Sequence, residues 1–111
     1  MHRGPERRGS IRFALSLEVS YTVLARRKPV RKGAGRTIDL SSSGLSFSTD
    51  GPLLTGQRLE VSIDWPVLLD GATKLQLVMS GVVARTNGTA AALQIQRHQF
   101  RTRRVELKVT T

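Results

Sequence analysis

A strict alternation of apolar and polar residues near the N-terminus limits the possible folds of this chain more than any other feature. Over residues 13–23 the odd positions are Phe13, Leu15, Leu17, Val19, Tyr21 and Val23, and the even ones are Ala14, Ser16, Glu18, Ser20 and Thr22. A period of two places the large apolar side chains on one face of a strand, whereas a helix would scatter them around its axis. The segment predicts a long β-strand with one buried face.

The rest of the chain continues in strands separated by turns. The expected strands are Arg36–Leu40, a strand starting at Leu45, Leu59–Trp65 ended by Pro66, Lys74–Arg85 with a bulge or bend at Ser80-Gly81, and Ala91–Gln96. The expected turns are Ser41–Gly44, Asp50–Pro52, Asp70-Gly71 and Asn87-Gly88, of which the last is the strongest hairpin signal. Arg26–Gly35, which holds Pro29, Gly33 and Gly35, is interpreted as a basic loop.

This pattern predicts an all-β fold, a small antiparallel barrel or sandwich of about six strands. With 111 residues the chain is long enough for a single domain. The tail, residues 97–111, fits two interpretations: Val105, Leu107 and Val109 alternate as in a strand, while Phe100 and the arginines after it could begin a short helix.

Composition limits the cellular compartments in which the protein is expected. The absence of cysteine excludes disulfides and thiolate metal sites and is compatible with a reducing compartment. No apolar run reaches the roughly 20 residues of a membrane-spanning helix, and the basic N-terminus leads into no signal-peptide core. We therefore expect a protein that is not exported, with a cytoplasmic location.

Positive charge gathers at the two ends of the chain. The net charge is +10, and ten of the 18 lysines and arginines lie in residues 1–36. Such a field favours an anionic partner: a nucleotide, a nucleic acid, an acidic protein or a membrane surface. Most of the cations are arginine, which suits bidentate contact with phosphate or a guanine edge.

An enzymatic function is not indicated. His2 and His98 lie near opposite ends of the chain, without carboxylates at the spacing of a triad or a metal site. The serines of the Ser41–Ser43 run lack the context of a nucleophile elbow. We expect no catalytic residues, no metal and no cofactor.

Two short motifs carry the functional signal. Arg8-Gly9-Ser10-Ile11-Arg12 precedes the first strand, and Asp39-Leu40-Ser41-Ser42-Ser43-Gly44 spans a turn between two strands. In this order they resemble the RxxxR and DxSxxG motifs of PilZ domains. Arg3–Arg7, Arg27–Arg31 and Arg97–Arg101 match RxxxR too, so position before the first strand selects Arg8 and Arg12.

The resemblance covers about residues 7–100 and implies a fold and a ligand. PilZ domains are six-stranded antiparallel β-barrels, usually followed by a helix, that bind the bacterial second messenger cyclic di-GMP. It implies one domain over residues 1–111, with a flexible arm (1–12), a barrel (13–96) and a basic tail (97–111). The protein would transmit the bound ligand as a conformational or surface change to a downstream protein partner.

The resemblance also assigns roles to the motif residues. Arg8 and Arg12 would contact guanine edges or phosphates from the arm. Asp39 would accept hydrogen bonds from a guanine, and Ser41 would bond base or phosphate. Gly44 would permit a positive φ and a close backbone approach. As an alternative for the turn, Asp39 and Ser41 would only cap their own backbone.

Arg7 precedes the first motif arginine, at a position that in the family influences whether one ligand or a stacked pair is bound. We predict the intercalated pair, because its roughly four negative charges would be held better by one more cation. The Thr89–Ile95 segment departs from the family pattern, with alanines where glycine is common and Ile95 in place of an aromatic residue.

Two other functions remain as alternatives. A small basic β-barrel that binds nucleic acid fits the charge and the sequence pI of about 11.6. Only five aromatic residues are present, however, and four fall on the apolar phase of strands, which leaves few for base stacking. A PilZ-like adaptor that no longer binds ligand is the third possibility, against which the intact motifs argue.

Overall fold

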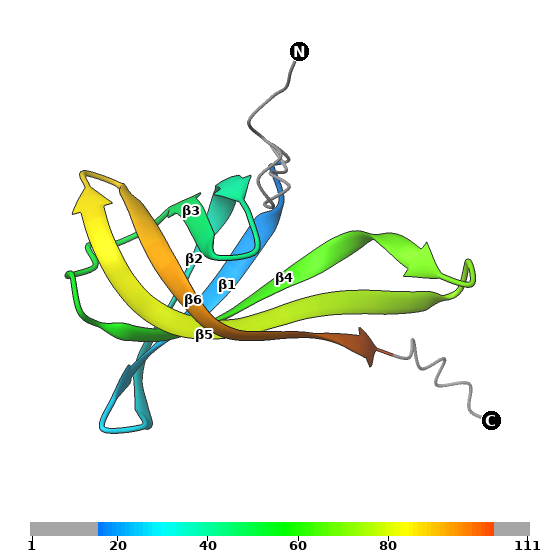
Figure 1. The fold of residues 1–111 in the computed structure, drawn as a ribbon, viewed down its shortest axis with the longest axis horizontal. Coiled ribbons are helices and arrows are strands. Elements are labelled where there is room, and N and C mark those ends of the chain that lie inside the picture. Colours follow the sequence, from blue (N-terminus) through cyan, green and yellow to red (C-terminus); the bar gives the residue numbers. More distant parts are fainter. Residues whose placement is uncertain (1–15, 104–111) are drawn as a thin grey trace, which may run out of the picture.

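The computed structural model describes residues 16–103 of the chain. They form six strands: β1 (Glu18–Ala25), β2 (Lys28–Leu40), β3 (Gly44–Ser48), β4 (Arg58–Leu69), β5 (Thr73–Asn87) and β6 (Ala90–Arg103). Neighbouring strands are antiparallel and close a barrel in the order β1-β2-β3-β6-β5-β4 (Figure 1). The expected six-stranded antiparallel barrel is confirmed, and the part of the chain described contains no helix.

The barrel interior takes the apolar phase of each strand. The alternation expected for the first strand is confirmed from Glu18 onward, since Val19, Tyr21 and Val23 are buried. The strand begins later than expected, because Ser16 and Leu17 precede it, and Phe13 and Leu15 lie outside the described residues. The rest of the core is Leu40, Leu45, Phe47, Leu53, Leu59, Val61, Ile63, Leu77, Met79, Val83, Ala91 and Leu93. The rings of Tyr21 and Phe47 pack tilted, with centroids 5.7 Å apart. Burial of these side chains is the main force that closes the barrel.

The expected basic loop over Arg26–Gly35 is wrong, because β2 begins at Lys28 and pairs with β1 along this stretch. Its glycines serve close packing. Gly33 lies opposite Tyr21, and a Cβ on Gly33 would collide with the Tyr21 ring. A Cβ on Gly35 would collide with the backbone carbonyl of Ser48. Glycine therefore marks close contacts within the sheet here, whereas the sequence pattern suggested an irregular loop.

The expected stop at Pro66 is also wrong, since β4 continues to Leu69. Strand β1 pairs with β4 only as far as Ile63. Beyond that point no strand of residues 16–103 lies beside one edge of β4, and the pairing with β5 shifts register between Asp64 and Leu68. Proline is tolerated at such edges and bulges because no ladder hydrogen bond needs its missing N–H.

The expected hairpins are confirmed. Asn87 pairs with Ala90 across a turn in which Gly88 has a φ of 65°. Asp70 and Gly71, both at positive φ, join β4 to β5. The bend expected at Ser80-Gly81 is a register shift between β5 and β6.

Strands β4, β5 and β6 continue beyond the barrel as a three-stranded arm (Figure 1). Trp65 of β4 and Phe100 of β6 make an edge contact there, with ring centroids 5.4 Å apart. Since β6 reaches Arg103, the first part of the basic tail is strand and not helix. Residues 104–111 lie outside the described range, so the short helix expected after the barrel remains an expectation there.

Candidate functional site

The turn between β2 and β3 contains the serine of the second motif. The backbone N–H of Ser41 donates to the Gly44 carbonyl at 2.9 Å. The Ser41 hydroxyl lies 3.4 Å from the Ser43 N and 3.3 Å from the Gly44 N. These two contacts are long for hydrogen bonds to a hydroxyl. Ser41 thus shapes the turn, while its hydroxyl is held weakly enough to exchange partners.

A second contact fixes the turn to the barrel. The Ile95 N–H of β6 donates to the Ser43 carbonyl at 3.0 Å. Strand β6 also pairs with β3 from Gly44, opposite Gln94. The turn is therefore tied to two strands, which limits its freedom to move.

Asp39 is placed by a bulge in β2. The pairing of β2 with β3 shifts register between Thr37 and Asp39. Thr37 and Leu40 are both buried, so the alternation changes phase between them, with Ile38 exposed and Asp39 half-buried. In a regular strand Asp39 would point into the core with Thr37. The bulge gives that inner position to Leu40 and spares the carboxylate from the core.

Gly44 does not have the positive φ expected of it. The glycines with positive φ in the described chain are Gly56, Gly71 and Gly88. Gly44 begins β3 and pairs with Gln94, which requires extended backbone. The expected close approach is modest, since a Cβ on Gly44 would lie 3.4 Å from the Leu93 carbonyl oxygen.

The segment that leads into β1 contacts the barrel beside this turn. The Leu17 N–H donates to the Thr37 Oγ1 at 2.8 Å, and the Thr37 N–H donates to the Leu17 carbonyl at 2.8 Å. The Arg36 side chain donates to the Ser16 Oγ and to the Ser16 carbonyl, each at 2.8 Å. These bonds hold Ser16 and Leu17 against the end of β2 that leads to Asp39.

Arg7, Arg8 and Arg12 lie outside the described residues. The structure therefore brings together Asp39, Ser41 and Gly44 and places the chain that follows the arginine motif beside them. The contacts of the three arginines themselves stay predictions.

Two residues of this region were missed by sequence reasoning. Arg36 also lies 3.8 Å from Glu18, so its guanidinium joins β2 to the start of β1. Thr37 is the buried polar residue of the described chain. The available signal was the interval from Thr37 to Leu40, which breaks the period of two just before the motif.

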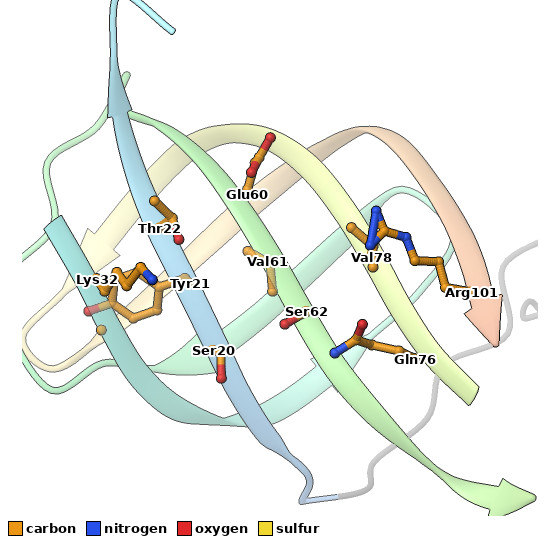
Figure 2. Close-up of a pocket in the computed structure, with 11 residues that line it drawn as sticks. Ser20, Tyr21, Thr22, Lys32, Glu60, Val61, Ser62, Gln76, Val78 and Arg101 are labelled. Atoms are coloured by element: carbon orange, nitrogen blue, oxygen red, sulfur yellow. The ribbon is translucent and has the colours of Figure 1, made fainter. Parts of the chain in front are cut away.

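Two surface depressions lie elsewhere, on the outer face of β1, β2, β4, β5 and β6. Figure 2 shows one of these depressions, where Ser20, Ser62 and Gln76 lie between Lys32 and Arg101. This depression has a volume of about 470 Å³. Asp39, Ser41 and Gly44 line neither depression, so both are separate from the motif turn.

Across residues 16–103, no three His, Asp or Glu side chains gather in a way that could hold a metal ion. No helix in that range is long and apolar enough to cross a membrane.

The fold and this turn define a class: a small closed antiparallel barrel whose β2–β3 turn presents a carboxylate and a hydroxyl beside the incoming N-terminal chain. The chain belongs to the PilZ domain family, whose model matches residues 6–108 and so spans both motifs. No curated protein and no solved structure gave a significant match. PilZ domains are binding and receptor domains, and the family supports a cyclic di-GMP receptor role in general terms.

Proposed function

We propose that this protein is a receptor for cyclic di-GMP, without catalytic activity of its own. The observation that carries the proposal is the pairing of Leu17 with Thr37, which sets the chain leading from the RxxxR motif beside the DxSxxG turn. Family membership over residues 6–108 supports the same ligand.

Chain length makes joint contact feasible. Arg12 is four positions before Ser16, and four extended residues span at most about 14 Å. Ser16 is held by Arg36, three positions from Asp39. A chain of this length allows Arg12 to reach the turn, and the proposal is that Arg12 and Arg8 both contact ligand there.

The residue types match the ligand. Arginine pairs with the O6 and N7 of a guanine or with a phosphate. The Asp39 carboxylate supplies acceptors for guanine donors, and the Ser41 hydroxyl can exchange its long contacts within the turn for a base or phosphate. A cyclic dinucleotide with two guanines and two phosphates uses both kinds of group.

We infer that the ligand acts by ordering residues 3–12 against the barrel, which creates a new surface for a downstream protein partner. Hydrogen exchange checks this directly: we expect residues 3–12 to gain protection on binding. Equal protection with and without ligand would rule the mechanism out.

Calorimetric titration with cyclic di-GMP tests the proposal. We expect Arg8→Ala, Arg12→Ala and Asp39→Ala each to weaken binding by at least about five-fold, because one bidentate base contact contributes about 1–3 kcal/mol. Arg85→Ala is the matched control, since Arg85 is an exposed arginine of β5. Folded wild-type protein that shows no binding heat, or a control that loses as much affinity as the motif variants, would contradict the proposal.

A further inference from the structure

The hairpin between β1 and β2 is the most strongly charged surface of the described chain. Figure 1 shows it projecting from the barrel, and every residue from Ala25 to Lys32 is exposed. It carries five cations and no carboxylate: Arg26, Arg27, Lys28, Arg31 and Lys32. We call residues 25–32 the basic hairpin.

The basic hairpin is separate from the motif site. Strand β1 starts at Glu18, beside the bound Ser16 and Leu17, and ends at Ala25 in the hairpin. At about 3.3 Å per residue, the two ends of this strand are roughly 23 Å apart. The proposed dinucleotide site therefore does not account for these cations.

The backbone at the hairpin tip is unfavourable for the residues it carries. Arg26 and Arg27 have φ values of 54° and 69°. A two-residue hairpin with both central residues at positive φ strongly prefers Asn-Gly, and a side chain such as arginine costs about 1–2 kcal/mol there. Two strained arginines at an exposed tip suggest that their charge serves a function.

The charges of the hairpin are largely available. Arg31 donates to the Pro52 carbonyl at 2.7 Å, which anchors the base of the hairpin to the loop after β3. Within residues 16–103, no ion pair joins Arg26, Arg27, Lys28 or Lys32 to a carboxylate. These four side chains can meet an external anion without breaking an internal ion pair.

The composition of the hairpin favours nucleic acid over other anionic partners. Its apolar side chains beyond Ala25 are Pro29 and Val30, and Val30 is 60% exposed. Membrane insertion and protein interfaces need a larger apolar area, whereas nucleic-acid interfaces are polar and strongly positive.

The shape of the hairpin favours a duplex over a single strand. Single strands bind by stacking on exposed aromatic rings. In the described chain, Tyr21 and Phe47 are buried, and the ring of Phe100, which is 52% exposed, lies on β6 against Trp65 and outside the basic hairpin. A two-stranded ribbon fits the major groove of B-form DNA.

We propose that the basic hairpin binds duplex DNA through its phosphates, without sequence preference. Arg26, Arg27, Lys28 and Lys32 supply the contacts, and Arg31 holds the ribbon in position. This binding is independent of cyclic di-GMP.

Fluorescence anisotropy with a labelled 20-bp DNA duplex, in a series of salt concentrations and without cyclic di-GMP, tests the proposal. For the wild type we expect log K to fall with log salt at a slope of about −4, one unit for each phosphate contact. The Arg26→Asn/Arg27→Gly variant loses two of these contacts, so its slope should be shallower, at about −2. Its Asn-Gly turn favours the same hairpin, so lost binding cannot be attributed to a lost fold.

Lys74→Gln/Arg85→Gln is the matched control, because it removes two exposed cations from β5. We expect it to keep the wild-type slope. Equal losses in the two variants would show a general charge effect and overturn the proposal. Anionic lipid vesicles provide the second probe, and hairpin-dependent binding to vesicles without binding to the duplex would overturn it as well.

Discussion

Leu17 and Thr37 hold each other through two hydrogen bonds, one from the Leu17 N–H to the Thr37 side chain and one from the Thr37 N–H to the Leu17 carbonyl, both at 2.8 Å. This pair connects the chain before β1 with the last part of β2. Thr37 is buried and Leu17 is half-buried, so the bond is partly shielded from water. It is the contact that sets the chain entering β1 beside the end of β2 that leads to Asp39.

Thr37→Val should destabilise the protein by about 1–3 kcal/mol, because it leaves the half-buried Leu17 N–H without its acceptor. Urea unfolding followed by the fluorescence of Trp65, the single tryptophan, measures this. Affinity for cyclic di-GMP should fall as well, since the N-terminal segment that carries the RxxxR motif loses its anchor. Thr37→Ser keeps the hydroxyl and should retain more of the stability and more of the affinity for cyclic di-GMP than Thr37→Val. If the two variants behave alike, the hydrogen bond from Leu17 does not account for the losses.

Tyr21, the single tyrosine, should resist ionisation. Burial and the hydrogen bond from its hydroxyl to Asp50 at 2.8 Å raise the pKa of Tyr21 to about 12. Because the folded protein holds this proton more tightly, the associated stability is complete below about pH 10 and declines as pH rises toward 12. Absorbance at about 295 nm should show no tyrosinate near pH 10, and a titration centred there would contradict the hydrogen bond between Tyr21 and Asp50.

Asp50, the partner of Tyr21, makes the stability of the protein depend on pH in the acid range. The hydrogen bond from Tyr21 holds the pKa of Asp50 below its ordinary value of 3.8. The stability from this bond is therefore present above pH 3.8 and is lost as pH falls through the lower pKa of the folded state. In urea unfolding, wild type should exceed Asp50→Asn at neutral pH, and the difference should shrink in acid. A constant difference at every pH would argue against this linkage.

The Arg26→Asn/Arg27→Gly variant should be more stable than wild type by about 1–2 kcal/mol, because both residues sit at positive φ. Thermal unfolding by circular dichroism gives the comparison. Arg31→Gln is a useful second variant: it removes a cation that donates to the Pro52 carbonyl and should not stabilise. A tip variant that is less stable than wild type would mean that the arginines are not strained.

Arg7 should decide how many ligands bind. The wild type is expected to bind a stacked pair of cyclic di-GMP molecules, and Arg7→Ala to bind one, because the pair concentrates about four negative charges. Calorimetric stoichiometry distinguishes two ligands per chain from one. Arg3→Ala, which removes a nearby arginine outside the motif, should leave the stoichiometry at two. One ligand per wild-type chain would refute this prediction.

Several features could be read from the sequence because they depend on neighbours along the chain. Alternation marked the buried face of β1, and Asn87-Gly88 marked the last hairpin, where Asn87 pairs with Ala90. Asp39, Ser41 and Gly44 gather at one turn because they are close in sequence. The family motifs were recognisable for the same reason.

Other features were decided only by strands meeting across the barrel. Gly33 belongs to a strand because the Tyr21 ring fills the space of its missing Cβ. Pro66 continues β4 because β1 no longer pairs there. Asp39 is kept from the core by a bulge against β3, and Leu17 is held by Thr37 from twenty positions away. Local patterns show which residues prefer burial or a turn, whereas strand partners and close contacts depend on distant parts of the chain that only the closed barrel brings together.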